Sequence, residues 1–144
     1  MWQRCAILEP GADALLVIDA SAVVQACLSE ADLEGLGGHD LIAPPLLWSE
    51  ATSVLHELEW RRDLSRQHTD AARGRLARVR IRQRSPKGLH EHAWQVASEL
   101  GWAKTYDAEY VALARLMRCS LLTVDARLAA TAGRLVEIRT PTEL

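Results

Sequence analysis

The stretch that decides the fold is LLVIDASAVVQACL, residues 15–28, in which four apolar residues run into one carboxylate, Asp19. A short apolar run of this kind is typical of a buried strand, and the apolar segment after it is helix-like. A carboxylate at such a junction must be solvated, paired or bound to a cation, because burying it unpaired is very costly. The sequence therefore raises the question of what holds the charge of Asp19.

The composition is that of an ordinary globular protein. The chain has 144 residues, of which 49% are hydrophobic and 25% are charged, and its net charge is −2 at pH 7. This length suits one domain with a substantial core. The cysteines are scattered without a C-x-x-C pair, which argues against a disulfide framework and a structural zinc site. We interpret them as small core residues in a reducing compartment: Cys5, Cys27 and Cys119.

Residues 1–14 are expected to form a leader segment before a domain at 15–144, with Pro10-Gly11 as a break between them. The leader contains no apolar run long enough for a signal peptide. No segment approaches the ~18 uninterrupted apolar residues of a membrane span. We therefore expect a cytoplasmic protein with no membrane partner.

Short apolar runs alternate with amphipathic segments along the chain. This alternation predicts an α/β fold with a mostly parallel sheet that is covered by helices on both faces. The expected strands are residues 15–18, 41–43, 78–84, 120–124 and 135–138, and residues 34–40 are expected to form a loop. The expected helices are residues 21–28, 44–58, 65–77, 90–100, 108–117 and 126–132.

A second unit of strand, aspartate and helix lies near the other end of the chain. Asp125 follows LLTV at residues 121–124, just as Asp19 follows LLVI. In a parallel sheet both acids emerge at the same edge, where ligands bind. Helix N-termini there favour anions, so each aspartate alone is explained equally well as a helix N-cap.

Two further acids open predicted helices and point to the same edge of the sheet, Glu50 and Asp107. Four carboxylates in one cleft repel one another and raise one another's pKa, unless a divalent cation lies among them. Oxygen-only ligands suit Mg²⁺ or Mn²⁺, and Mg²⁺ is typically shared with substrate phosphates. The pattern favours metal-assisted phosphoester hydrolysis, with Asp19 and Asp107 as direct metal ligands. For Glu50 and Asp125, direct ligation, action through a water and orientation of the nucleophile are all compatible with the sequence.

Four motifs carry a resemblance to a known family: VIDASAVV, PPLLWSEATSVL, LGWAKTYDAEYVALA and LLTVDARLA. In this order and spacing they resemble PIN-domain proteins, and most of all the VapC-type ribonuclease toxins of VapBC toxin–antitoxin pairs. The resemblance covers residues 15–138 and leaves out the leader. It implies a PIN-like α/β/α sandwich with a central, mostly parallel sheet of four to five strands.

The resemblance also implies a function and a site. It implies an Mg²⁺-dependent endoribonuclease with an RNA substrate, a cognate antitoxin and a homodimer. Two hydroxyl residues match positions beside the acids: Ser21, whose hydroxyl fits either a metal-site neighbour or a helix start, and Thr123. The family's acidic quartet, catalytic and metal-binding, carries over to Asp19, Glu50, Asp107 and Asp125.

An arginine-rich stretch spans residues 61–87, with ten basic residues and only two acids. Phosphate backbones attract such patches. A solvated helix face and a contact for an acidic segment of an antitoxin are alternative interpretations. The candidate RNA-binding residues are Arg78, Arg80, Arg82 and Arg84.

Other side chains receive simpler interpretations. Trp94 and Trp102 are expected in the core, and Trp48 either packs there or stacks on a base. Glu109 lies off the helix face of Asp107, so we expect it to be solvated. No histidine is assigned to catalysis.

Two kinds of protein compete with the nuclease. A non-catalytic PIN-like module that binds RNA or protein is the main alternative, against which the presence of all four acids argues. A receiver or an aspartyl-phosphate enzyme is disfavoured because Ser21 stands where a haloacid-type phosphatase has its second aspartate. A dinucleotide-binding fold lacks its G-x-G-x-x-G.

Overall fold

The structure, a computed structural model, describes residues 15–144, so the predicted leader at 1–14 lies outside the described residues. Its centre is a five-stranded sheet in the order β3-β2-β1-β4-β5, in which every neighbouring pair is parallel. The predicted α/β class with a parallel sheet of four to five strands is confirmed. The strands are β1 (Leu15–Ile18), β2 (Asp40–Ala43), β3 (Ile81–Gln83), β4 (Ser120–Leu122) and β5 (Ile138–Arg139).

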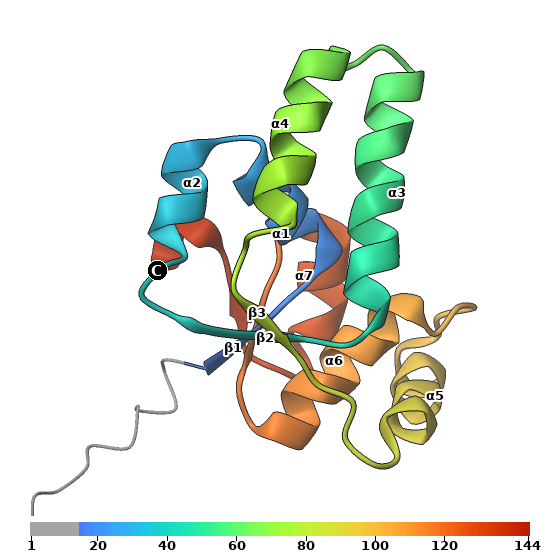
Figure 1. Ribbon diagram of the computed structural model, residues 1–144. Helices are drawn as coiled ribbons and strands as arrows, with labels where there is room; N and C mark the ends of the chain where they lie inside the picture. The colour runs from blue at the N-terminus through green and yellow to red at the C-terminus, as the bar shows by residue number, and fades with distance from the viewer. Residues whose placement is uncertain (1–14) are drawn as a thin grey trace, which may run out of the picture.

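Helices cover the sheet from two sides, with α1 to α4 above it and α5 and α6 below it in the view of Figure 1. None of the helices in the described part of the chain is long and apolar enough to cross a membrane. The helices are α1 (Ala20–Cys27), α2 (Glu30–Gly35), α3 (Leu46–Trp60), α4 (Arg66–Leu76), α5 (Leu89–Leu100), α6 (Tyr106–Met117) and α7 (Ala126–Ala132), followed by the 3₁₀ turn η1 (Pro141–Glu143).

Strand β1 occupies the middle of the sheet, which explains its apolar sequence. It pairs with β2 on one side and with β4 on the other, so that Val17 lies between Ile42 and Leu121. Leu16, Val17 and Ile18 are buried. A strand covered on both faces needs a continuous apolar run rather than an alternating one. Asp19 directly follows β1 and therefore lies in the middle of the row formed by the carboxyl ends of the strands.

Four predicted elements are wrong in their limits, one of them the strand predicted at 120–124, which ends at Leu122. The expected loop at 34–40 is shorter, because α2 continues to Gly35 and β2 begins at Asp40. The expected third strand at 78–84 is reduced to Ile81–Gln83. The last strand starts at Ile138, where the predicted strand ended, because the N–H groups of Leu135 and Val136 donate to the Ala132 carbonyl and close α7.

The tryptophans also correct one prediction. Trp94 is 67% exposed, so its expected place in the core is wrong. The buried face of α5 contains Ala93 and Val96. Trp94 is the next residue after Ala93, so its side chain lies on a different face of the helix, which is exposed to solvent. Trp48 and Trp102 are partly buried against the core. Cys27 is buried and Cys119 half-buried, while Cys5 lies outside the described residues.

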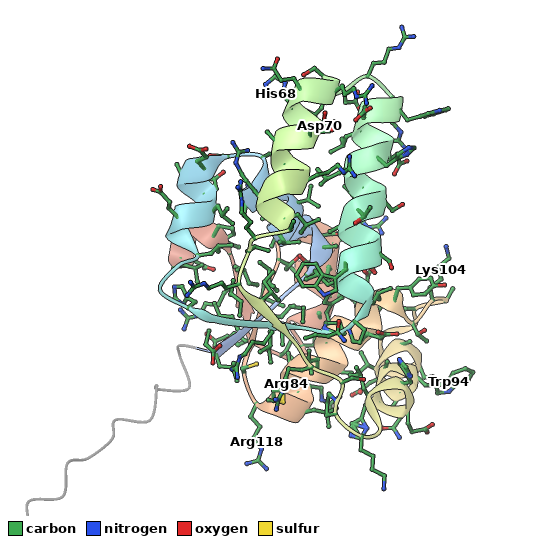
Figure 2. The ribbon with its side chains drawn as sticks, in the orientation of Figure 1. His68, Asp70, Arg84, Trp94, Lys104 and Arg118 are labelled. Atoms are coloured by element: carbon green, nitrogen blue, oxygen red, sulfur yellow. The ribbon has the colours of Figure 1, made fainter. Side chains whose placement is uncertain are left out.

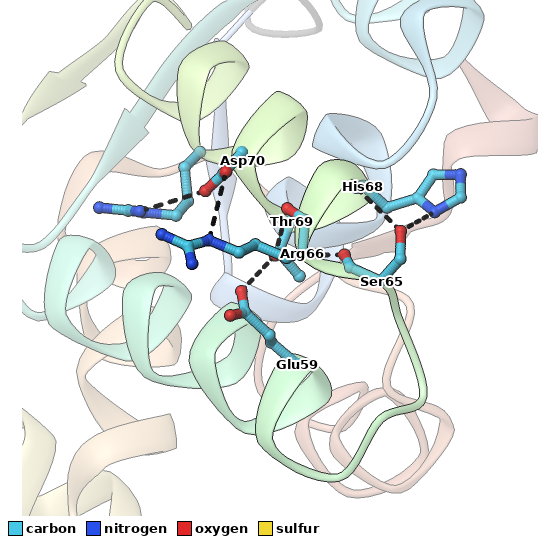
Figure 3. Close-up of polar contacts among 7 residues, drawn as sticks. Glu59, Ser65, Arg66, His68, Thr69 and Asp70 are labelled. Carbon is cyan, nitrogen blue, oxygen red and sulfur yellow. Dashed lines mark hydrogen bonds and ion pairs between the residues drawn. The ribbon is translucent and has the colours of Figure 1, made fainter.

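Helices α3 and α4 form a hairpin that projects beyond the sheet (Figure 1) and is fixed by polar contacts (Figure 3). Thr69 is fully buried between them and donates its hydroxyl to Glu59. Ser65 caps α4, since its Oγ accepts the N–H of His68 at 3.2 Å. Asp70 lies between two arginines, Arg66 at 3.9 Å and Arg73 at 3.5 Å. Part of the positive charge of the arginine-rich stretch is thus balanced within this hairpin.

Candidate functional site

Asp19 is held by hydrogen bonds at the start of α1. Its Oδ1 accepts the Ser21 hydroxyl at 2.7 Å and the Ala22 N–H at 2.9 Å, and its Oδ2 accepts the Thr123 hydroxyl at 2.5 Å. The residue is only 4% exposed, and this burial raises the pKa of its carboxyl, although the three hydrogen bonds oppose the rise. The carboxylate is therefore both the cap of α1 and a buried, strongly oriented acid.

The two strand-aspartate units are interlocked through their hydroxyls. Ser21 follows Asp19, yet its Oγ accepts the N–H of Val124 at 3.3 Å from the other unit. Thr123 precedes Asp125, yet its hydroxyl donates to Asp19 and also accepts the N–H of Asp125 at 3.1 Å. The structure thus brings both predicted hydroxyl residues to Asp19, which is consistent with orienting roles that stay a prediction.

Asp125 caps α7 and also faces a cavity. Its Oδ1 accepts the N–H groups of Arg127 at 2.9 Å and Leu128 at 3.1 Å. Asp125 lines a cavity with a volume of about 900 Å³. Helix capping and a place in the candidate site are therefore compatible, because one carboxylate oxygen serves the helix and leaves the other uncommitted.

Glu50 reaches the same cavity from α3, one turn after the helix begins. Its Oε2 lies 3.4 Å from the Tyr110 hydroxyl, whereas its buried Oε1 has no hydrogen-bond partner among the described residues. Burial, followed by the charge of Asp107, raises the pKa of Glu50 to about 7. A buried carboxylate oxygen without a donor is suited to a cation or to a proton.

Tyr110 is a member of this site that sequence reasoning missed. It is buried, and burial together with the nearby carboxylates raises its pKa, so its hydroxyl stays protonated and donates to Glu50. The signal was present in the sequence, because Tyr110 lies three residues after Asp107 and therefore on the same face of α6.

Asp107 lies in the first turn of α6 and lines the cavity with Glu50 and Asp125. The residue is exposed, but partial desolvation of its carboxylate and the charge of Asp125 raise its pKa, which Arg127 lowers in part. Asp19 does not line the cavity, but the charge of Asp107 raises its pKa. The structure thus gathers three of the predicted acids around one cavity, with the fourth buried in electrostatic contact with them.

Four further residues that line the cavity were not predicted as site residues. They are two basic and two aromatic side chains from the loop between α5 and α6, the start of α6 and helix α7: Trp102, Lys104, Tyr106 and Arg127. Lys104 lies on that loop, at the right of Figure 2. Acidic, basic and aromatic side chains therefore line the same cavity.

The acids fit a hydrated divalent cation. Within residues 15–144, no three His, Cys, Asp or Glu side chains are close enough together to hold a metal ion directly. Mg²⁺ does not need such a cage, since it is usually bound through one or two carboxylates and keeps several waters. The partnerless Glu50 Oε1 and the raised pKa values of three acids indicate negative charge that a cation would balance.

The four candidate RNA-binding arginines do not form one cluster. Arg78, Arg80 and Arg82 line a second cavity of about 700 Å³ near the amino ends of β2 and β3. Arg82 forms an ion pair with Asp40 at 2.5 Å. Arg84 lies at the other end of β3, where its N–H donates to the Ala43 carbonyl. Three of the four are thus at the edge of the sheet opposite to the acids.

The expectation that Glu109 is solvated is wrong. Its side chain is only 13% exposed and lies 3.6 Å from His90, and burial raises its pKa. Glu109 also contributes to the raised pKa of Glu50. Helix α6 packs closely against α5. This packing covers the face of α6 that carries Glu109, which the spacing from Asp107 had predicted to be exposed to solvent.

Comparison with known proteins gives a consistent result. The chain is 36% identical over 123 residues to Ribonuclease VapC9 of Mycobacterium tuberculosis and to VapC ribonuclease Mb0985 of Mycobacterium bovis, an alignment that covers 81% of this chain and 91% of each relative. It is 35% identical over 130 residues to Ribonuclease VapC1 of M. tuberculosis, covering 85% of this chain and 95% of the relative.

Two solved structures share the fold. PAE2754 from Pyrobaculum aerophilum superposes with a TM-score of 0.64 at 22% identity, covering 87% of this chain and 91% of that one. VapBC2 from Rickettsia felis, bound to a DNA fragment from their promoter, superposes with a TM-score of 0.60 at 12% identity, covering 88% and 98%. The PIN domain model matches residues 16–134. This chain therefore belongs to the PIN domain family.

Proposed function

We propose that this protein is an Mg²⁺-dependent endoribonuclease and the toxin of a type II toxin–antitoxin pair. The observation that carries the proposal is the convergence of Glu50, Asp107 and Asp125 on one cavity, with Asp19 buried beside them. The relatives at 35–36% identity bear the names of VapC ribonucleases, which supports RNA as the substrate.

The four carboxylates would hold Mg²⁺, for which Mn²⁺ can substitute. When bound, such an ion polarises a phosphoryl oxygen and lowers the pKa of a bound water. The chain itself fixes the acids in place. Ser21 and Thr123 orient the carboxylate of Asp19, and Tyr110 does the same for one oxygen of Glu50.

Glu50 is the residue best suited to move a proton. A general base works best with a pKa near the working pH, and burial brings the pKa of Glu50 to about 7. Its Oε1 is free of hydrogen bonds from the described residues and can accept a proton from an attacking water. Asp107 in α6 and Asp125 at the N-terminus of α7 supply the other carboxylates that line the cavity.

The arginines at 78, 80, 82 and 84, in and beside β3, would guide the RNA toward the site. All four are exposed and lie in or beside β3, an edge strand, three of them at the second cavity and Arg84 after the carboxyl end of the strand. Changing Arg78, Arg80, Arg82 and Arg84 together to Gln should weaken RNA binding and make its salt dependence shallower by about 0.7 per lost phosphate contact. Binding is measured on an Asp19→Asn background, and an unchanged slope would refute this path.

The partners follow from the same proposal. The solved VapBC2 structure contains both members of a toxin–antitoxin pair, so we propose a cognate antitoxin for this chain. A homodimer and a cytoplasmic location complete the proposal. Analytical ultracentrifugation of the purified protein, alone and with its co-expressed antitoxin, would measure both assemblies.

The test of the function is a cleavage assay on total bacterial RNA. The purified protein should cut RNA with Mg²⁺ or Mn²⁺, lose this activity with EDTA, and lose it in the folded Asp19→Asn variant. Cleavage that persists in EDTA would refute the metal dependence. RNA or antitoxin binding without any cleavage, under every metal condition, would instead identify the non-catalytic PIN-like module.

A further inference from the structure

Besides the acids, the cavity is lined by aromatic and basic side chains, which suit a nucleotide rather than a metal. The cavity has a volume of about 900 Å³, within the range of sites that enclose a small molecule. Trp102 and Tyr106 supply aromatic rings, and Lys104 and Arg127 supply cations. None of these four belongs to the acidic set, so the acids leave this part of the lining unexplained.

The aromatic rings are placed for stacking. Tyr106 is 57% exposed although it is large and partly apolar, and it directly precedes Asp107 at the start of α6. Trp102 is half-buried against the core, which fixes its ring while part of it faces the cavity. Successive bases of single-stranded RNA stack on such rings with little regard to sequence.

The cations are available for a phosphate. Lys104 and Arg127 form no salt bridge with any other residue in the described range. The charge of Arg127 acts on Asp107, whose pKa it lowers, so the cation and the acid share one electrostatic environment. A phosphate bound in this cavity would have cations available close to the acid site.

We infer that Trp102, Tyr106, Lys104 and Arg127 form a nucleotide subsite that holds the RNA next to the bond to be cut, with the base on the rings and its phosphate on the cations. This inference rests on the proposed ribonuclease function and adds how the substrate is seated. Since stacking tolerates every base, the subsite supplies affinity and position rather than sequence choice.

The experiment separates the rings from the cations with two probes. One is a fluorescent pool of random 20-nucleotide single-stranded RNA, and the other is inorganic polyphosphate, which has the charge but no bases. All variants are built on the Asp19→Asn background so that no RNA is cut. Circular dichroism melting confirms that each variant is folded.

Tyr106→Ala should raise the Kd for RNA by about 5- to 150-fold and leave the Kd for polyphosphate unchanged. Tyr106→Phe keeps the ring and should retain the RNA affinity. Lys104→Gln should weaken both probes and reduce the salt slope for RNA by about 0.7. These three results together would support the subsite.

Two matched variants serve as controls. Trp94→Ala removes an exposed ring on the outer side of α5, and Trp94 points away from the molecule in Figure 2. Arg118→Gln removes a cation at the far end of α6, about 18 Å from Tyr106 along the helix. Both should leave the RNA affinity unchanged.

The outcomes distinguish this inference from the proposed function. If wild-type protein cuts RNA but Tyr106→Ala binds it as well as Trp94→Ala does, the subsite is refuted and the nuclease stands. If Tyr106→Ala weakens RNA and polyphosphate equally, the ring does not stack and the subsite is again refuted. If wild-type protein neither cuts nor binds RNA, both proposals fail.

Discussion

The unit of β1, Asp19 and α1 and the unit of β4, Asp125 and α7 share one sequence pattern but place their aspartates in different environments. Asp19 is 4% exposed and accepts three hydrogen bonds on its two oxygens. Asp125 is half-buried, accepts two backbone N–H groups on one oxygen and lines the cavity. The same local motif thus yields one buried, fully oriented acid and one acid that is open to the cavity.

The difference comes from the neighbours that each unit receives. Asp19 stands at the end of the central strand, where Thr123 of the adjacent strand reaches it. Asp125 stands one strand further out, and its hydrogen bonds come from its own helix. The charge of Asp19 raises the pKa of Glu50, whereas the charge of Asp125 raises the pKa of Asp107. We therefore expect the two aspartates to differ in every measurable property.

The largest difference is expected in cleavage. Asp19→Asn should reduce kcat/KM by about 10²- to 10⁴-fold, since it removes the charge at the most connected position of the site. Asp125→Asn should cost only about 10- to 100-fold, because Asn still caps α7 and the other acids remain. Steady-state kinetics on a labelled RNA measures both. Equal losses would show that the two units are equivalent in the reaction.

The second largest effect is expected for removal of the Thr123 hydroxyl, which joins the two units. Thr123→Val keeps the shape but removes the donor to Asp19 and the acceptor for the N–H of Asp125. Loss of an orienting partner typically costs about 10- to 100-fold in activity or metal affinity. Isothermal titration with Mn²⁺ and the cleavage assay measure the effect, and Thr140→Val, which alters an exposed hydroxyl at η1, is the control. A Thr123→Val enzyme with wild-type affinity and rate would exclude an orienting role.

Stability should also separate the units. Asp19→Ala leaves the hydroxyls of Ser21 and Thr123 and one N–H without their acceptor, which costs about 1–3 kcal/mol of unfolding free energy. Asp125→Ala removes an ordinary N-cap and should cost about 1 kcal/mol. Asp19→Asn keeps an acceptor and relieves repulsion, so it should be at least as stable as Asp125→Ala. Urea denaturation without metal gives the three values, and a severely destabilised Asp19→Asn would favour a purely structural role.

The smallest expected effect is on the titration of Glu50. Its pKa is raised from 4.5 to about 7 by burial, by Asp107 and, to a smaller extent, by Asp19. Asp19→Asn should therefore lower the pKa of Glu50, whereas Asp125→Asn should leave it near 7. Carboxyl-carbon NMR titration of the metal-free protein measures this, and an equal response to both variants would contradict the asymmetry.

The same titration has a consequence for stability. The unfolded chain ionises Glu50 near pH 4.5, while the folded protein keeps the proton until about pH 7. The unfolded state is thus favoured progressively as the pH rises through this window, so Glu50 lowers the unfolding free energy between pH 4.5 and 7. Glu50→Gln should remove this loss, which urea denaturation at pH 5 and pH 8 would detect.

Much of the fold could be predicted because its elements are encoded locally. The apolar run at 15–18 and the caps at Asp19 and Asp125 give β1, α1 and α7 nearly as the structure has them. The errors fall where tertiary contacts decide. Ile138 rather than Leu135 begins β5, because the hydrogen bonds of 135 and 136 turn back to α7. Trp94 is outside because α5 turns another stripe toward the core.

By itself the sequence determined the alternation of strands and helices and the parallel sheet, because both follow from local periodicity and from the handedness of crossovers. It also determined that Asp19 and Asp125 lie at the same end of the sheet, because each follows a strand and the carboxyl ends of parallel strands lie together. Only the tertiary structure decided which acid is buried, that Tyr110 donates to Glu50, and that three arginines lie at the opposite end of the sheet. Burial, hydrogen bonding and charge coupling depend on distances between residues far apart in the chain, and those distances exist only after the layers have packed.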